Sequence, residues 1–119
     1  MAKAIYWQRG ESLDYPNGSG SKIDAKTIVV LKSGATGRIG VIGNDIPDGA
    51  TGSVHVTGVF EMAKSSTNAI ALGEDVYWDG TGITEASNDG EGTPTYYPKA
   101  GFAAAAAAAA ATKILVKIG

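Results

Sequence analysis

The chain of 119 residues contains no cysteine, so it can form neither a disulfide bond nor a thiolate metal site. Its one histidine, His55, cannot supply the three or four nitrogen and sulfur ligands of a zinc site. Ten basic and twelve acidic residues give a net charge of −2 without long runs of either sign. This balance lacks the basic surface that binds nucleic acid or an anionic membrane, so neither is expected as a partner.

Long apolar segments are also absent, since no run approaches the roughly eighteen residues that a membrane-spanning helix needs. The first nine residues, Met1–Arg9, lack the apolar centre of a signal peptide. We therefore expect a soluble chain that is not exported by a cleaved signal. A length of 119 residues favours one domain, for which oligomerisation would add stability.

Residues suited to catalysis are few. His55 falls on the polar face of a predicted strand and has no neighbour in the sequence to form a dyad, which favours a structural role. Asp75, Asp79 and Glu85, with Glu74 beside them, are candidates for a calcium site or a carboxylate hydrolase. Their spacing does not match a twelve-residue calcium loop, so we predict no metal site. Because residues suited to catalysis are few, we also predict that the chain is not an enzyme and binds no cofactor or small-molecule substrate.

Glycine and β-branched residues are abundant, which is typical of short strands joined by tight turns. The clearest example follows the turn signal Pro47-Asp48-Gly49, where residues 54–61 alternate between two faces. Val54, Val56, Gly58 and Phe60 share one face, whereas His55, Thr57, Val59 and Glu61 share the other. This period predicts one strand with a packed side and a mostly wet side.

Similar patterns predict the other strands, with residues 26–31 as the most apolar and therefore central strand. Gly34 and Gly37 predict a hairpin turn in preference to a short glycine repeat. The fold class is therefore all-β, a single compact antiparallel β-barrel or sandwich with an extended N-terminal arm and little helix. We expect residues 1–9 to form the arm and residues 10–119 a single β-domain. The remaining strands are predicted at residues 10–15, 38–42, 75–78, 83–84, 101–102 and 112–118.

Nine consecutive alanines, Ala103–Ala111, interrupt this pattern. Alanine is the best helix former, but nine residues are fewer than the twelve or more that a helix needs without tertiary support. A strand from Gly101 and Phe102 followed by a small-residue turn is the favoured interpretation. Alternatively, the alanines stand in for side chains that were never identified, in which case their chemistry predicts nothing.

Tyrosine and tryptophan outnumber phenylalanine, and both are enriched at protein interfaces. Residues 3–7 favour β-structure without an adjacent partner, so they predict a mobile arm or an edge strand. Tyr6 and Trp7 within them suit an interface as well as a core. Trp78 suits a core, although Trp78, Tyr96 and Tyr97 together would suit a stacking platform for carbohydrate.

Three blocks of the chain together resemble the small capsid cement, or head decoration, proteins of tailed bacteriophages. No block is a catalytic signature. The order of the blocks is also similar to that of the family, as are the segment Gly37-Arg38-Ile39-Gly40-Val41 and the final apolar strand. The alanine run departs from the more mixed small-residue stretch of that family. The blocks are Gly-Glu-Ser-Leu-Asp-Tyr-Pro-Asn at 10–17, Ile-Pro-Asp-Gly-Ala-Thr-Gly-Ser-Val-His-Val-Thr-Gly-Val-Phe at 46–60, and Gly-Glu-Asp-Val-Tyr-Trp-Asp at 73–79.

This resemblance implies an all-β barrel or sandwich like the lambda-type head decoration protein, assembled as a homotrimer on the outer capsid surface of the virion. It implies no catalytic residues. The partner would be the major capsid protein, and the chain would be made in the host cytoplasm and stabilise the head. The alternative is a small β-sheet carbohydrate- or receptor-binding module of a virion.

Within that scheme, residues 2–9 would add a strand to an edge of the capsid protein, because backbone pairing tolerates differing neighbours. The candidate capsid-binding residues are Lys3, Ile5, Tyr6, Trp7 and Arg9.

Overall fold

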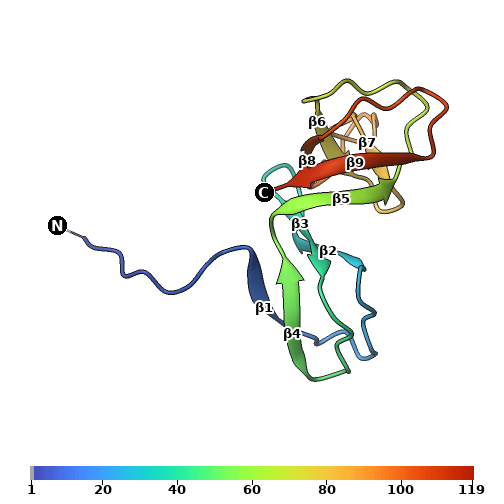
Figure 1. The fold of residues 1–119 in the computed structure, drawn as a ribbon. Helices are drawn as coiled ribbons and strands as arrows, with labels where there is room; N and C mark the ends of the chain where they lie inside the picture. The colour runs from blue at the N-terminus through green and yellow to red at the C-terminus, as the bar shows by residue number, and fades with distance from the viewer. Residues whose placement is uncertain (1) are drawn as a thin grey trace.

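The computed structural model describes residues 2–119, which form nine strands and no helix (Figure 1). No helix that could cross a membrane is therefore present among these residues. The prediction of an all-β fold is confirmed. The strands are β1 Ser12–Pro16, β2 Ile28–Lys32, β3 Arg38–Ile42, β4 Thr51–His55, β5 Gly58–Ala63, β6 Asp75–Trp78, β7 Ile83–Thr84, β8 Lys99–Ala103 and β9 Lys113–Ile118.

The strands form one continuous sheet that does not close into a barrel. Its main path runs β1-β4-β3-β8-β6-β7, with β2 added to β3, and with β9 and then β5 added to β8. Every pair is antiparallel except the short parallel contact of Arg38 with Lys99 between β3 and β8. The barrel form of the prediction is thus replaced by an open, folded sheet of the sandwich type.

Strand β3 joins the two ends of this sheet. One edge of β3 pairs with β2, while the other edge is divided between two partners. Arg38 at its start pairs with β8, and Val41 and Ile42 at its end pair with β4. Figure 1 accordingly shows β1 and β4 below β3, and β5 to β9 above it. We call these parts the small lobe (β1, β4 and residues 17–25 and 43–50) and the large lobe (β5–β9).

Two predictions about strands were wrong. The apolar segment Ile28–Lys32 is an edge strand, half-buried and paired only with β3, so the central position belongs to β3. The strand predicted at residues 54–61 is two strands, interrupted at Val56 and Thr57, with a φ of 128° at Gly58. The predicted alternation survives the break, because Val54 is buried and Val59 exposed, but the chain passes there from one lobe to the other.

Most turns follow the predicted chemistry. Gly34 has a φ of 84°, and its carbonyl accepts a hydrogen bond of 2.8 Å from Gly37 N, which closes the β2–β3 hairpin. Pro47 to Ala50 form the expected turn, closed by a 3.0 Å bond from Ala50 N to Pro47 O. The Asp79–Gly82 turn joins β6 to β7. Turn residues therefore located the chain reversals correctly.

The alanine run forms a strand end and turns instead of a helix, as the favoured interpretation predicted. Ala103 ends β8, and Ala104 N donates to Leu115 O at 2.8 Å. Ala107 forms a bridge with Ile70, in which each backbone N donates to the other's carbonyl. Tertiary backbone partners thus outweigh the helix propensity of nine alanines.

Apolar side chains form two separate cores. The large lobe is built around twelve buried residues, among them Val76, Ile83 and Val116, with Trp78 packed against them. The small lobe packs around three, which are Ile46 and Val54 of its own and Ile42 from the end of β3. The small core is therefore too limited to order its long loops through apolar burial alone.

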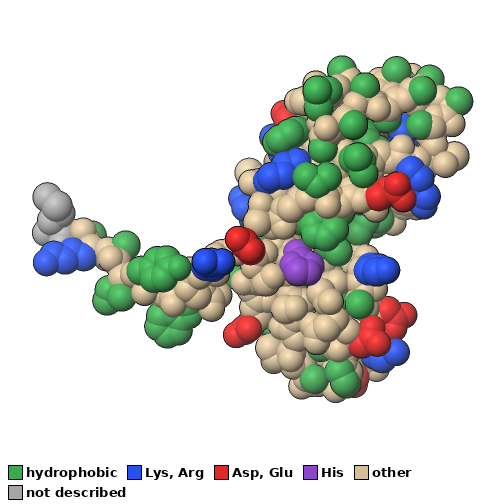
Figure 2. Space-filling view, viewed as in Figure 1, with side chains coloured by type: hydrophobic (Ala, Val, Ile, Leu, Met, Phe, Trp, Pro, Cys, Tyr) green, Lys and Arg blue, Asp and Glu red, His purple; other side chains and the backbone are tan. Residues whose placement is uncertain are grey.

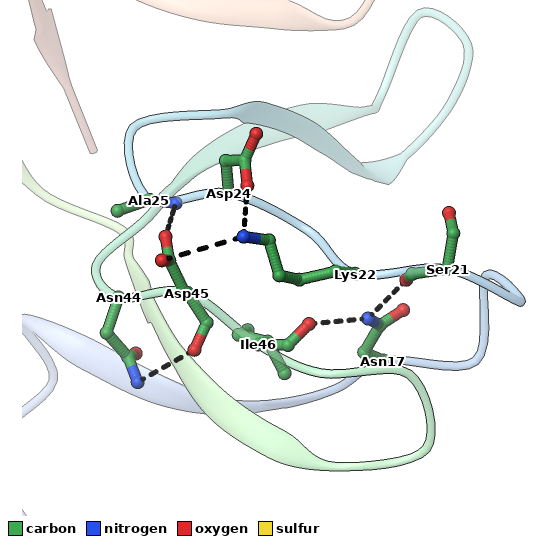
Figure 3. Close-up of polar contacts among 8 residues, drawn as sticks. All are labelled: Asn17, Ser21, Lys22, Asp24, Ala25, Asn44, Asp45 and Ile46. Carbon is green, nitrogen blue, oxygen red and sulfur yellow. Dashed lines mark hydrogen bonds and ion pairs between the residues drawn. The ribbon is translucent and has the colours of Figure 1, made fainter.

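Polar contacts stabilise those loops (Figure 3). The buried Asn17 side chain donates through Nδ2 to Ser21 O at 2.8 Å and to Ile46 O at 2.9 Å. On the outside, Asp45 accepts a 2.8 Å hydrogen bond from Ala25 N and lies 3.9 Å from the Lys22 ammonium group. Lys22 also pairs with Asp24 at 3.2 Å, which raises the pKa of Lys22.

Candidate functional site

The N-terminal segment extends away from the body as an arm (Figures 1 and 2). Residues 2–9 belong to no strand, and no hydrogen bond or ion pair made by the described residues involves them. All five candidate residues lie here: Lys3, Ile5, Tyr6, Trp7 and Arg9. Met1, also predicted to belong to the arm, lies outside the described residues.

The arm exposes three large apolar side chains. Ile5 is 90 % exposed, Tyr6 81 % and Trp7 88 %. Contiguous exposed apolar groups of this size are typical of surfaces that bind another molecule. The alternative position for Tyr6 and Trp7, in the core of this chain, is wrong.

The root of the arm is fixed to the end of β4. Glu11 O accepts a 3.0 Å hydrogen bond from Val56 N, and Ser12 then pairs with His55 as β1 begins. The Ser12 Oγ and His55 Nδ1 atoms are 3.0 Å apart, and the His55 ring lies 5.8 Å from the Phe60 ring. His55 thus contacts β1 and β5 together, which is the structural role that its position predicted.

An open groove of about 460 Å³ lies beside this root. β5 forms one wall through four consecutive residues, Val59–Met62, and the ends of β3 and β4 form the other. The other lining residues are Lys26, Ile28, Val41, Ile42, Gly43 and His55. Sequence reasoning missed the groove, because its residues come from four separate segments; the only local signal was Thr57-Gly58 within an otherwise regular strand pattern.

The candidate carboxylates do not converge. Asp75 Oδ1 pairs with the Lys99 ammonium group at 3.2 Å, whereas Glu85 accepts a 2.6 Å hydrogen bond from Asn68. Burial raises the pKa of Glu85, but hydrogen bonding, with Asn68 donating to Oε1, outweighs it and leaves the pKa lowered. Across residues 2–119, no three His, Cys, Asp or Glu side chains gather as metal ligands would.

Asp79 has a structural contact network of its own. It accepts hydrogen bonds from Ser65 Oγ at 2.6 Å, Thr81 N at 2.8 Å and Gly82 N at 2.9 Å. Partial burial raises its pKa, but these donors outweigh that effect and lower the pKa overall. A carboxylate held in this way closes the β6–β7 turn and is unsuited to act as a general base at neutral pH.

The three aromatic residues proposed as a stacking platform are not equally accessible. Trp78 packs against the large core and Tyr97 is half-buried, whereas Tyr96 is exposed. The core position expected for Trp78 is therefore confirmed. One exposed ring gives little support to a carbohydrate-binding surface, which commonly stacks several rings on a sugar.

A protein-family model described as phage cement protein matches residues 7–118. The chain belongs to the phage cement protein family. No curated protein and no solved structure matches it. Family membership indicates a structural protein associated with the phage capsid and located in the virion. Within the arm, the matched region includes Trp7 and Arg9.

Proposed function

We propose that this cement protein decorates the outer surface of the capsid, where neighbouring major capsid proteins meet, as a homotrimer that stabilises the head. The observation that carries the proposal is the exposed arm on a chain of this family. In this proposal residues 1–9 act as the arm and residues 10–119 as a single β-domain made in the host cytoplasm.

The arm pairs with the capsid protein by strand addition. Residues 2–9 have unpaired backbone groups, so they can form main-chain hydrogen bonds with an exposed sheet edge. Ile5, Tyr6 and Trp7 then bury apolar area, and aromatic residues of this kind contribute much of the binding energy at interfaces. Lys3 and Arg9 flank them and suit acidic groups beside that edge.

Stabilisation follows from multivalent binding. A trimer with three arms contacts several capsid subunits at once, so modest single contacts combine into tight attachment. A ligand that binds the assembled shell, and not its dissociated subunits, stabilises the shell by mass action. The shell then resists heat and internal pressure better than an undecorated one.

Co-sedimentation with empty shells of the major capsid protein tests the proposal. We expect the intact chain to bind and to raise the temperature of shell rupture. Deletion of residues 2–9, or Tyr6→Ala with Trp7→Ala, should weaken binding at least about tenfold, as loss of two aromatic anchors does. Tyr96→Ala is the matched control, since it removes an exposed ring outside the arm.

Unchanged affinity after deletion of the arm would reject arm-mediated attachment. If the intact chain bound no shell, and a glycan array gave reproducible binding, decoration itself would be rejected in favour of a carbohydrate-binding module.

A further inference from the structure

The outward face of β5, β9 and β8 carries apolar residues where a solvated sheet would carry polar ones. Val59 is 56 % exposed, Phe102 43 % and Leu115 41 %. Strand register places them together, because Lys117 of β9 lies between Phe102 on one side and Val59 on the other, with Leu115 two residues away. In Figure 2 hydrophobic side chains gather over β5 and β9 with charged groups among them.

Both signs of charge occur on this face. Glu61 of β5 lies opposite Leu115, and Lys113 and Lys117 of β9 are its diagonal neighbours. Diagonal neighbours in a sheet are about 7–8 Å apart, a separation that Glu and Lys side chains can bridge. In residues 2–119 the ion pairs join Lys22 to Asp24 and Asp45, and Lys99 to Asp75, so Glu61 and Lys113 have no opposite charge bound to them.

The edge of the sheet beside this face is also unpartnered. β5 pairs with β9 on one side, and no described residue forms a ladder with its other side. An exposed strand edge with apolar neighbours is a site for association unless something covers it. The arm of the same chain does not cover it, because the arm extends away from the body (Figure 1).

We propose that this face, made of Val59, Glu61, Phe102, Lys113, Leu115 and Lys117, binds a second copy of the chain. Copies in a closed ring of three meet head to tail, and this face allows such a contact, because Glu61 of one copy can pair with Lys113 of the next beside a shared apolar centre. A capsid surface dominated by one charge would attract one of these groups and repel the other. The inference rests on the proposed homotrimer and assigns its interface, leaving the arm free for the capsid.

Charge reversal with rescue tests this assignment by sedimentation velocity of the purified chain over a wide concentration range. Glu61→Lys and Leu115→Ser should each weaken self-association at least about tenfold. The double variant Glu61→Lys/Lys113→Glu should restore it to within about threefold of wild type, because the pair is re-formed with its charges exchanged. Glu91→Lys, the same charge change in the exposed 86–95 loop, is the matched control and should leave self-association unchanged.

A cross-linking measurement extends the test to decorated shells. Because the chain has no cysteine, Leu115→Cys supplies its one thiol, and a short bis-maleimide should link copies on shells. Leu72→Cys, at an exposed position outside the face, should not. Self-association unaffected by Glu61→Lys and Leu115→Ser, or shells decorated without Leu115→Cys cross-links, would overturn the interface while leaving decoration intact. Cross-linked copies that bind no shell would reject decoration and retain the interface.

Discussion

The two lobes are held together by different means. The large lobe surrounds twelve buried apolar residues, whereas the small lobe surrounds three. In the small lobe, the loops are instead connected by hydrogen bonds from the buried Asn17 side chain and by the ion pair of Lys22 with Asp45. Apolar burial therefore organises one half of this chain and local polar bonding the other, and substitutions in each half should respond differently.

The largest effect is expected from Gly101→Ala in the large lobe. Gly101 has a φ of 149°, and a Cβ atom there would overlap the Lys117 carbonyl oxygen of β9. Backbone cannot yield as a side-chain tip can, so we expect a loss of about 4 kcal/mol in the free energy of unfolding. Urea denaturation measures it. Gly92→Ala, in open space, should change the free energy by less than about 0.5 kcal/mol, and equal losses for both would contradict the packing described.

Matched truncations compare the cores directly. Ile83 in the large core and Ile46 in the small core are both essentially inaccessible, at 0 % and 1 % exposure. Ile→Ala should cost about 3.5 kcal/mol at Ile83 and about 2.5 kcal/mol at Ile46, where fewer neighbours surround the cavity. Because β3 pairs with both lobes, each variant should still unfold in one transition.

Whether the two lobes unfold together can be measured by comparing the unfolding curves from two spectroscopic signals. In a Trp7→Phe background, Trp78 fluorescence reports the large lobe, while circular dichroism reports the whole sheet. An Ile46→Ala variant whose dichroism changed before its fluorescence would show that the small lobe unfolds alone.

Polar bonding in the small lobe is tested by Asn17→Ala. The substitution removes the bonds that Asn17 donates to the Ile46 and Ser21 carbonyls at 2.9 Å and 2.8 Å, and the Oδ1 acceptor that Ser19 N uses at 3.0 Å. Loss of a buried hydrogen-bonding group should lower the free energy of unfolding by about 2 kcal/mol. Asn68→Ala, which removes an exposed 2.6 Å bond to Glu85, should cost less than about 1 kcal/mol in the same assay. If Asn17→Ala were no more costly than this control, the small lobe would not depend on its polar contacts.

The smallest effect concerns acid stability of the large lobe. The pKa of Asp79 in the folded chain lies below its ordinary 3.8, so ionised Asp79 favours folding above that pH. This contribution is lost as the pH falls through 3.8 toward the folded value. Asp79→Asn should therefore flatten the dependence of unfolding free energy on pH below about 4, and Ser65→Ala should do so partly. An unaltered slope in Asp79→Asn would show that other carboxyl groups govern acid unfolding.

Local pattern predicted much of the fold, because turns and strand alternation depend on neighbouring residues. The turns at Gly34–Gly37 and Asp79–Gly82 and the final strand follow from sequence alone. The edge position of β2 does not, since the apolar run 28–31 is equally compatible with a central strand. The passage between lobes at Val56 and Thr57 also escaped prediction, because period-two alternation continues across it.

For the candidate site, the arm was predictable and the surfaces of the body were not. Residues 3–7 combine strand-forming side chains with no adjacent partner, which a sequence displays directly. The outward face of β5, β9 and β8 depends on register between segments nearly sixty residues apart, which Val59 pairing with Lys117 establishes. Without knowledge of the pairing, the sequence does not show that the apolar residues of these strands lie together on one exposed face.

The attachment of the arm to β1 bears on how the molecule carries mechanical load. The arm leads directly into β1, whose five residues pair antiparallel with β4. In the proposed attachment, a capsid that swells and pulls the arm along the β1 axis would stress these ladder bonds in shear, so that they resist together instead of opening one after another. Because β3 pairs with both β4 and β8, tension on β4 would reach both lobes through β3.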